Sequence, residues 1–148
     1  MAEIFEPANP DYRAVVTSIF NKANFVTSLG IQLGAFGPGW CESSLTLEPR
    51  HSQQDGFAHA GLVSTIADHT SGAAAGSLAP AGHTVLSVEF KINLLRPGVG
   101  DSLFSRADVL RNGKRIIVTE SSVFAVTEAS RKLIAKGIFT LAVVPLPT

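Results

Sequence analysis

Three side chains that could take part in chemistry lie close together in one segment of the sequence. Gln53 and His59 can donate hydrogen bonds, and Asp68 is the one formal charge in a long run of small and apolar residues. Burying a polar group without partners costs about 2–7 kcal/mol, and an unpaired charge costs more. Asp68 is therefore either a surface group, facing solvent or an arginine, or an acid held in a dry site for catalysis. We favour the catalytic interpretation.

The run that contains Asp68 predicts a long buried helix over 60–79, which Pro80 and Gly82 end. Its apolar residues cannot be confined to one stripe, and a helix that is apolar all round is normally a buried helix. Glycines cost helix propensity, about 1 kcal/mol each, so their presence indicates close backbone packing. The simplest arrangement is a sheet curved around this helix. The residues concerned are Leu62, Val63, Ile66, Ala67, Ala73, Ala74, Ala75 and Leu78, with Gly61, Gly72 and Gly76 among them.

The start of this helix is a second place where chemistry is expected. The amides of Ala60 and Gly61 lie where helical N–H groups lack partners and where the helix dipole favours a developing oxyanion. Ala60 and Asp68 are eight residues apart, however, which is about 12 Å along a helix. One carbonyl group cannot touch both within a single chain. If both act on it, the acid comes from a neighbouring subunit, and the protein is an obligate dimer.

The remaining pattern predicts the elements that position these residues. Strand 84–94 is expected to place Leu86, Val88, Phe90, Ile92 and Leu94 on one face and Ser87, Glu89, Lys91 and Asn93 on the other. Asn112-Gly113 indicates a hairpin. Hairpin-linked strands predict an antiparallel sheet and the α+β class. The other expected elements are a helix over 11–22, strands over 29–35 and 41–47, a polar loop over 49–58 and a last strand over 131–144.

Composition limits the classes of protein that remain. A chain of 148 residues that is 45% hydrophobic and 16% charged suits one globular domain. Twelve basic and twelve acidic residues cancel, so no global field favours nucleic acid or a membrane. The single cysteine, Cys41, excludes an internal disulfide and fits a reducing compartment. No signal peptide or membrane span is evident, so we expect a cytoplasmic protein.

The spacing Gln53, Gly56, His59-Ala60-Gly61, Asp68 resembles the hotdog-fold thioesterases, most closely the PaaI-like acyl-CoA thioesterase group. The resemblance covers roughly residues 28–143. It implies a single hotdog thioesterase domain over 1–148, with a short helical N-terminal extension over about 1–27. In that fold a curved antiparallel β-sheet wraps a long central helix. The chain departs from the family motif at two positions, because Gln53 replaces an asparagine and Ala60 replaces the first glycine of HGG.

The resemblance also implies site residues outside the motif. Ser87 corresponds to a hydroxyl residue that accompanies the acid in the family. Basic residues near the hairpin would meet the phosphates of coenzyme A, and Phe57, Phe90 and Leu94 could line an aromatic or medium aliphatic pocket, which the N-terminal helix would cap. A homodimer is expected, and we expect it to pair into a homotetramer. The implied CoA-binding set is Leu94, Arg96, Arg111, Gly113, Lys114 and Arg115.

The implied activity is hydrolysis of an acyl-CoA thioester with an aromatic or a short to medium aliphatic acyl group. The thioester carbonyl would lie against the Ala60 amide, with Gln53 and His59 orienting the site. Asp68 would act either as general base or as nucleophile, and the sequence does not choose between the two. No metal or cofactor is expected beyond the coenzyme A of the substrate, and G-x-S-x-G, the motif of many serine hydrolases, is absent. Two alternatives stay open, namely a hotdog dehydratase or hydratase, for which His51 lies nearby, and a non-catalytic acyl-CoA-binding module.

Overall fold

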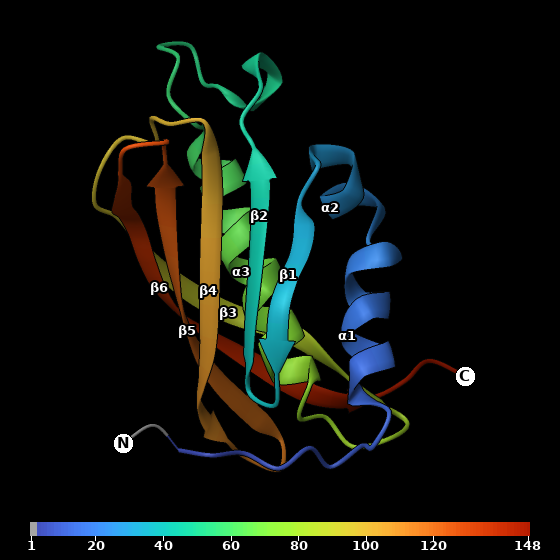
Figure 1. Cartoon of the computed structure of the whole chain (residues 1–148). Coiled ribbons are helices and arrows are strands. Elements are labelled where there is room, and N and C mark those ends of the chain that lie inside the picture. The colour runs from blue at the N-terminus through green and yellow to red at the C-terminus, as the bar shows by residue number, and fades with distance from the viewer. Residues whose placement is uncertain (1–2) are drawn as a thin grey trace.

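A six-stranded antiparallel sheet curves around one long helix, α3, in the computed structural model, which describes residues 3–148 (Figure 1). The strand order is β1-β2-β4-β5-β6-β3, so β1 and β3 form the two edges. None of the helices within residues 3–148 has the length and apolar character needed to cross a membrane. The elements are α1 (Tyr12–Asn21), α2 (Asn24–Leu29), β1 (Gln32–Gly37), β2 (Trp40–Thr46), the 3-10 turn η1 (Pro49–His51), α3 (Ala60–Gly76), β3 (His83–Leu94), β4 (Ser102–Asn112), β5 (Ile116–Val126) and β6 (Arg131–Pro145).

Helix α3 fills the hollow of the sheet, as predicted, and Ile66, Ala67 and Ala73 are fully buried there. The expectation of burial on every side is wrong for one stripe. This stripe follows the three- and four-residue spacing of a single helix face. Neither the sheet nor the N-terminal helices cover it fully. Its residues are small or polar, so covering them within one chain would bury little apolar surface. We call it the open stripe, and it consists of Gly61, Ser64, Thr65, Asp68 and Gly72.

Strand β3 departs from the predicted alternation. The register shifts between Ser87 and Glu89, which leaves a bulge at Val88. Ser87 pairs with the buried Leu141, and beyond the bulge Phe90 pairs with the buried Phe139. One inserted residue exchanges the two faces of a strand. Ser87 and Phe90 therefore share the inner face of the sheet, whereas the sequence pattern had placed them on opposite faces.

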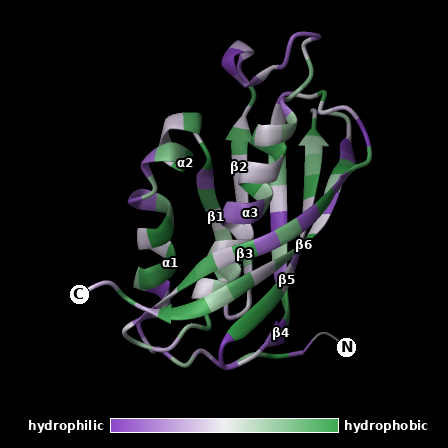
Figure 2. Ribbon diagram, turned by 180° about the vertical axis from the view of Figure 1, so that it is seen from behind, coloured by the Kyte–Doolittle hydropathy of each residue, from purple (hydrophilic) through white to green (hydrophobic). Residues whose placement is uncertain are grey.

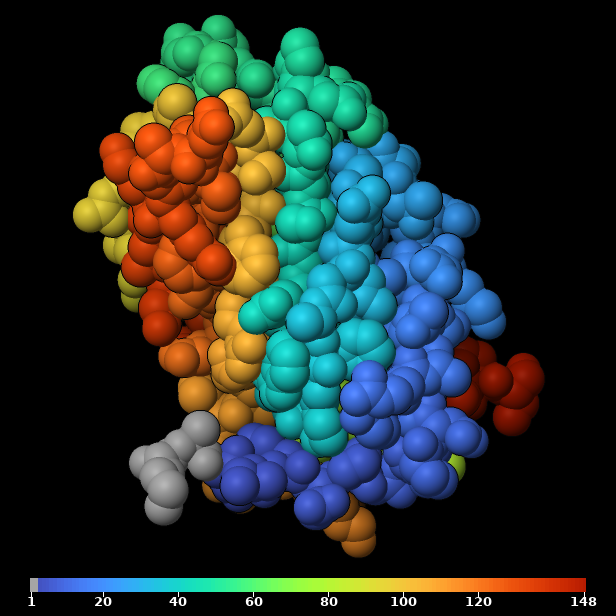
Figure 3. Space-filling model, in the orientation of Figure 1, coloured from blue at the N-terminus to red at the C-terminus, as the bar shows by residue number. Residues whose placement is uncertain are grey.

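Two short helices, α1 and α2, lie beside β1 and α3 (Figure 1). The predicted helix over 11–22 is confirmed, but α2 was missed and part of it was assigned to a strand. Helix α1 approaches α3 closely because Gly76 has no side chain, and a Cβ there would lie 2.6 Å from Cδ1 of Ile19. The segment before α1 crosses the lower end of the sheet (Figure 3). The predicted hairpin at Asn112-Gly113 joins β4 to β5.

The thiol of Cys41 gives a test of this packing. Its side chain is fully buried in β2. Burial, with a smaller contribution from the Glu42 carboxylate, raises the pKa of the Cys41 thiol to about 12. Because the thiolate is the reactive form, we expect native protein at pH 8 to react with a thiol reagent at least roughly 10³-fold more slowly than unfolded protein. Stopped-flow labelling with and without denaturant measures the ratio, and equal rates would contradict this packing.

Candidate active site

Asp68 lies on the open stripe of α3, where its carboxylate meets the hydroxyl of Ser87 on β3. The Ser87 Oγ donates a hydrogen bond of 2.7 Å to Asp68 Oδ1. The bulge at Val88 leaves Ser87 facing the helix, so the hydroxyl that the family resemblance implied does accompany the acid. A hydrogen bond from a neutral hydroxyl fixes the orientation of the carboxylate and leaves the second oxygen free to face a substrate or water.

The start of α3 offers a free backbone donor at Ala60. His59 is the N-cap residue, and its Nδ1 accepts the N–H of Gly61 at 2.8 Å. The N–H of Val63 bonds the His59 carbonyl in the first helical turn. Among the described residues, nothing accepts a hydrogen bond from the Ala60 amide, which is the usual state of a first helical residue. Ala60 is therefore a better oxyanion donor than Gly61, whose amide is already engaged within the protomer.

The side chain of Gln53 is fixed by the loop that precedes α3. Its Oε1 accepts hydrogen bonds from the N–H groups of Asp55, at 2.6 Å, and Phe57, at 3.1 Å. Two backbone donors on one oxygen settle which end of the amide is the carbonyl. The Gln53 NH₂ group, whose contact with the Asp55 carboxylate is long at 3.4 Å, is then the end available to a ligand. The end of the Gln53 side chain that remains available is thus a hydrogen-bond donor.

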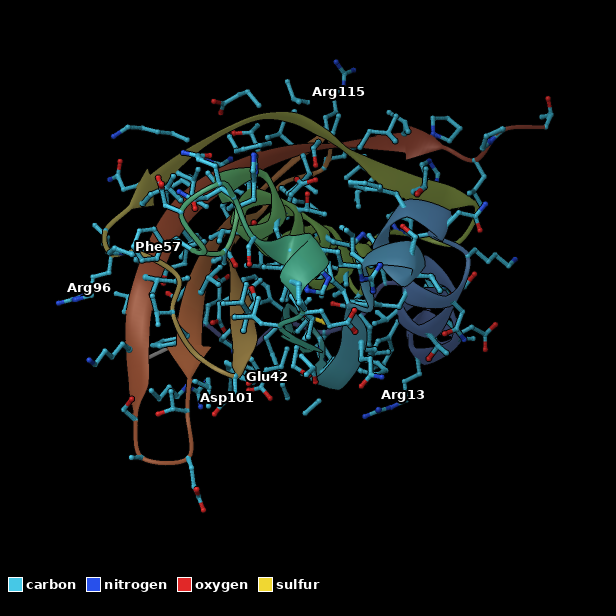
Figure 4. All side chains as sticks on the ribbon, turned by 90° about the horizontal axis from the view of Figure 1, so that it is seen from above. Arg13, Glu42, Phe57, Arg96, Asp101 and Arg115 are labelled. Carbon is cyan, nitrogen blue, oxygen red and sulfur yellow. The ribbon has the colours of Figure 1, made fainter. Side chains whose placement is uncertain are left out.

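Gln53 and Ala60 line the same hollow, which has a volume of about 330 Å³. Leu94 and Arg96 also line this hollow. The structure therefore brings these two predicted CoA-binding residues to the N-terminal end of α3. Arg96 donates to the carbonyl of Leu133 at 2.9 Å and remains exposed. Seen from above, Arg96 and Phe57 lie on the same side of the molecule (Figure 4).

The other predicted CoA-binding residues do not join this hollow within one chain. Arg111 lies near the end of β4, and Gly113, Lys114 and Arg115 form the β4–β5 turn, at the lower end of the molecule in Figure 1. The loop that carries Gln53 stands at the upper end. The long strands β4 and β5 separate the two groups. Arg96 is therefore the one of these basic residues at the hollow, and the turn could reach the hollow only from another subunit.

Asp68 and Ala60 are also separated along the continuous helix α3. Eight residues at 1.5 Å each give about 12 Å, as the sequence implied. The edge strand β3 contacts Asp68 through Ser87. It has no strand on its outer side (Figure 2). Its exposed apolar residues are unusual for an edge that faces water, because such an edge can pair with another chain. The exposed fractions are 58% for Leu86, 60% for Val88, 43% for Phe90 and 52% for Leu94.

The remaining histidines contribute differently. His51 is 3% exposed, accepts the Glu48 N–H at Nδ1 and contacts the Leu29 carbonyl through Nε2. Both ring nitrogens are engaged, so His51 is a structural clamp and has no free nitrogen to offer as a catalytic base. His69 packs edge-on against Phe20. Within residues 3–148, no group of three or more potential metal-ligating side chains gathers.

Sequence reasoning missed one residue beside the acid. Phe25, on the overlooked helix α2, lines a hollow that also contains Asp68 and Phe90. The signal that could have revealed α2 is Gly30, which follows the helix with φ of 86°. A glycine in this left-handed conformation commonly ends a helix. Six residues of mixed pattern gave no periodicity strong enough to show the helix otherwise.

Comparison with known proteins matches residues 55–131 to the thioesterase superfamily. Human acyl-coenzyme A thioesterase 13 is 32% identical over 127 residues, which cover 84% of this chain and 89% of the relative. A solved thioesterase family protein from Silicibacter pomeroyi is 32% identical, with a TM-score of 0.89 and coverage of 91% and 99% of the two chains. The E. coli PaaI protein, at 20% identity, shares the fold with a TM-score of 0.81 over 93% and 96%.

Proposed function

This chain belongs to the thioesterase superfamily and is a thioester hydrolase with the hotdog fold, and we propose that it hydrolyses acyl-CoA esters at sites shared between two subunits. The observation that carries the proposal is the hydrogen bond of 2.7 Å from Ser87 to Asp68 on the open stripe. It presents an oriented carboxylate on a face that one chain leaves uncovered. The human relative that is 32% identical is named as an acyl-coenzyme A thioesterase, which supports the choice of substrate.

The chemistry assigns distinct roles to the start and the middle of α3. The free N–H of Ala60, at the positive end of the helix dipole, stabilises the oxyanion that forms when the thioester carbonyl is attacked. The NH₂ group of Gln53 donates to the same oxygen and orients the substrate. Asp68 of the partner subunit removes a proton from the attacking water, or it attacks the carbonyl itself to form an anhydride that water then hydrolyses. In both routes the C–S bond breaks and the CoA thiolate leaves and takes up a proton. The products are the free acid and the CoA thiol.

Pairing of two β3 edges would bring these groups together. Antiparallel pairing about a two-fold axis extends the sheet across both subunits and sets the two α3 helices side by side in opposite directions. The open stripe suits that contact, since a Cβ at Gly72 would meet no atom within 4 Å in the protomer. The start of one helix then lies beside the middle of the other. Pairing of two such dimers into a tetramer remains part of the proposal.

The alternatives lose support at particular residues. A dehydratase needs a histidine base, and both ring nitrogens of His51 are occupied in a buried position. A binding module needs no oriented acid, yet Ser87 and Asp68 form that arrangement. We also place the enzyme in the cytoplasm, because the lone buried thiol of Cys41 fits a reducing compartment.

A hydrolysis screen tests the proposed function directly. We expect release of the CoA thiol from at least one class among acetyl-, butyryl-, dodecanoyl-, benzoyl- and phenylacetyl-CoA, with kcat of about 1–10³ per second. A thiol reagent follows the reaction, and crotonyl-CoA is included to detect hydration of the double bond. Hydration without hydrolysis would indicate the dehydratase, and tight binding without turnover would indicate the binding module.

A further inference from the structure

A long trough runs from the Asp68–Ser87 pair along the seam between α1 and the edge strand β3. Its volume is about 840 Å³, against about 330 Å³ for the hollow at Gln53 and Ala60. We call it the α1–β3 trough. Along β3 it extends from Ser87 to His83, four residues and thus about 13 Å. The residues that matter for the argument are Val15 and Ile19 of α1, Val85 and Leu141 of the sheet, and Asp68 and Ser87.

We propose that the α1–β3 trough holds the acyl group of the substrate as an extended aliphatic chain, and that Val15 and Ile19 set the chain length. This inference rests on the proposed function. The trough begins at the carboxylate assigned to the attack, so a group that enters it is attached directly to the reacting carbon. A second hollow that contains Asp68 lies on the α2 side, where Phe25 and Phe90 bound it, and its lining residues do not come from α1.

The interior of the trough is apolar, and its charges lie at the rim. Val15, Ile19 and Val85 are half-buried and Leu141 is almost fully buried, whereas the charged residues Asp11 and Lys22 are exposed. The carboxylate of Asp68 stands at the end where the trough begins. Apolar burial stabilises a chain by about 0.8 kcal/mol per CH₂ group. The imidazole of His69 also lines the trough. Burial lowers the pKa of His69 against the opposing effect of Asp68, which favours the neutral imidazole in this wall.

Size favours an extended chain over a single ring. An apolar cavity of about 150 Å³ accommodates benzene, so the trough offers more than five times the space of one aryl ring. A ring alone would leave most of the apolar wall in contact with water. The opposite assignment, with the pantetheine arm in the trough, suits the lining less well. Pantetheine carries amide groups, and Arg96, which can meet a phosphate, stands instead at the hollow beside Gln53.

Narrowing the trough from α1 tests the proposal. Val15→Phe should lower kcat/KM for dodecanoyl-CoA by roughly 10- to 100-fold and leave butyryl-CoA within about twofold, because only the longer chain reaches the new ring. Ala14→Phe, at an exposed position that also lines the trough, makes the same test if Val15→Phe does not fold. Thr17→Phe is the matched control, since Thr17 is exposed on the same helix and lies outside the trough.

The outcomes separate this inference from the function on which it rests. An equal loss for both substrates would show that the trough holds the pantetheine arm, and unchanged kinetics would show that it holds no part of the substrate. Either result overturns the inference while hydrolysis by the unsubstituted enzyme stands. If the unsubstituted enzyme cleaves no acyl-CoA at all, the proposed function fails and the assignment of the trough fails with it.

Discussion

Asp68→Asn lowers kcat by about 10²–10⁴-fold on every acyl-CoA substrate, the range that general acid–base groups contribute. The replacement keeps the size of the side chain and an oxygen that can accept the Ser87 hydroxyl, so the local packing is preserved. What is lost is the negative charge and the ability to accept a proton or attack a carbonyl. KM should change little, because Asp68 acts on the reacting carbon and the ester is bound mainly elsewhere. Steady-state release of the CoA thiol measures both constants.

A second carboxylate provides the control for this substitution. Asp101 is exposed in the turn before β4, and Asp101→Asn should leave kcat unchanged. Circular dichroism and thermal unfolding of both variants establish that the fold is intact. If Asp68→Asn hydrolyses the substrates as fast as the unsubstituted enzyme, the carboxylate has no catalytic role, and the assignment of the site is wrong.

Sequence patterns predicted the elements whose signal is local and repeated. The small and apolar run over 60–79 predicted α3, and Asn112-Gly113 predicted the β4–β5 hairpin. The spacing from Gln53 to Asp68 predicted that the candidate residues lie along one loop and one helix, and the structure places them there. These features depend on neighbours in the chain, so the sequence contains the information that determines them.

The features that sequence reasoning missed depend on contacts between distant segments. The bulge at Val88 exchanges the two faces of β3. The regular alternation of apolar and polar residues in that strand does not predict a bulge. The open stripe arises because the sheet covers only part of α3, which a count of apolar residues cannot show. The family resemblance grouped the basic turn at Lys114 with Arg96, and the length of β4 and β5 separates them within one chain. In each case the arrangement is set by tertiary packing.

The proposal of a shared site leads to an unusual expectation for pairs of inactive variants. Ala60→Pro should remove only the amide hydrogen at the helix start. Proline is favoured at the first helical position, and His59, with φ of −62° and ψ of 137°, already has the extended conformation that precedes proline. Loss of one oxyanion donor lowers kcat by about 10²–10³-fold. Ala60→Gly keeps the N–H and should retain activity, which makes it the matched control.

Mixing the Ala60→Pro and Asp68→Asn variants should then restore activity that neither has alone. In a mixed dimer, one of the two sites combines the intact Ala60 amide of one chain with the intact Asp68 carboxylate of the other. Random pairing of equal amounts gives mixed dimers in half of the population, so about a quarter of all sites are intact for a two-fold symmetric dimer. Co-refolding followed by the thiol-release assay measures this fraction. Activity that stays at the sum of the two variants would mean that each site is built within a single chain. One α3 helix would then have to supply both groups across about 12 Å of its own length, and the proposal of a shared site would be wrong.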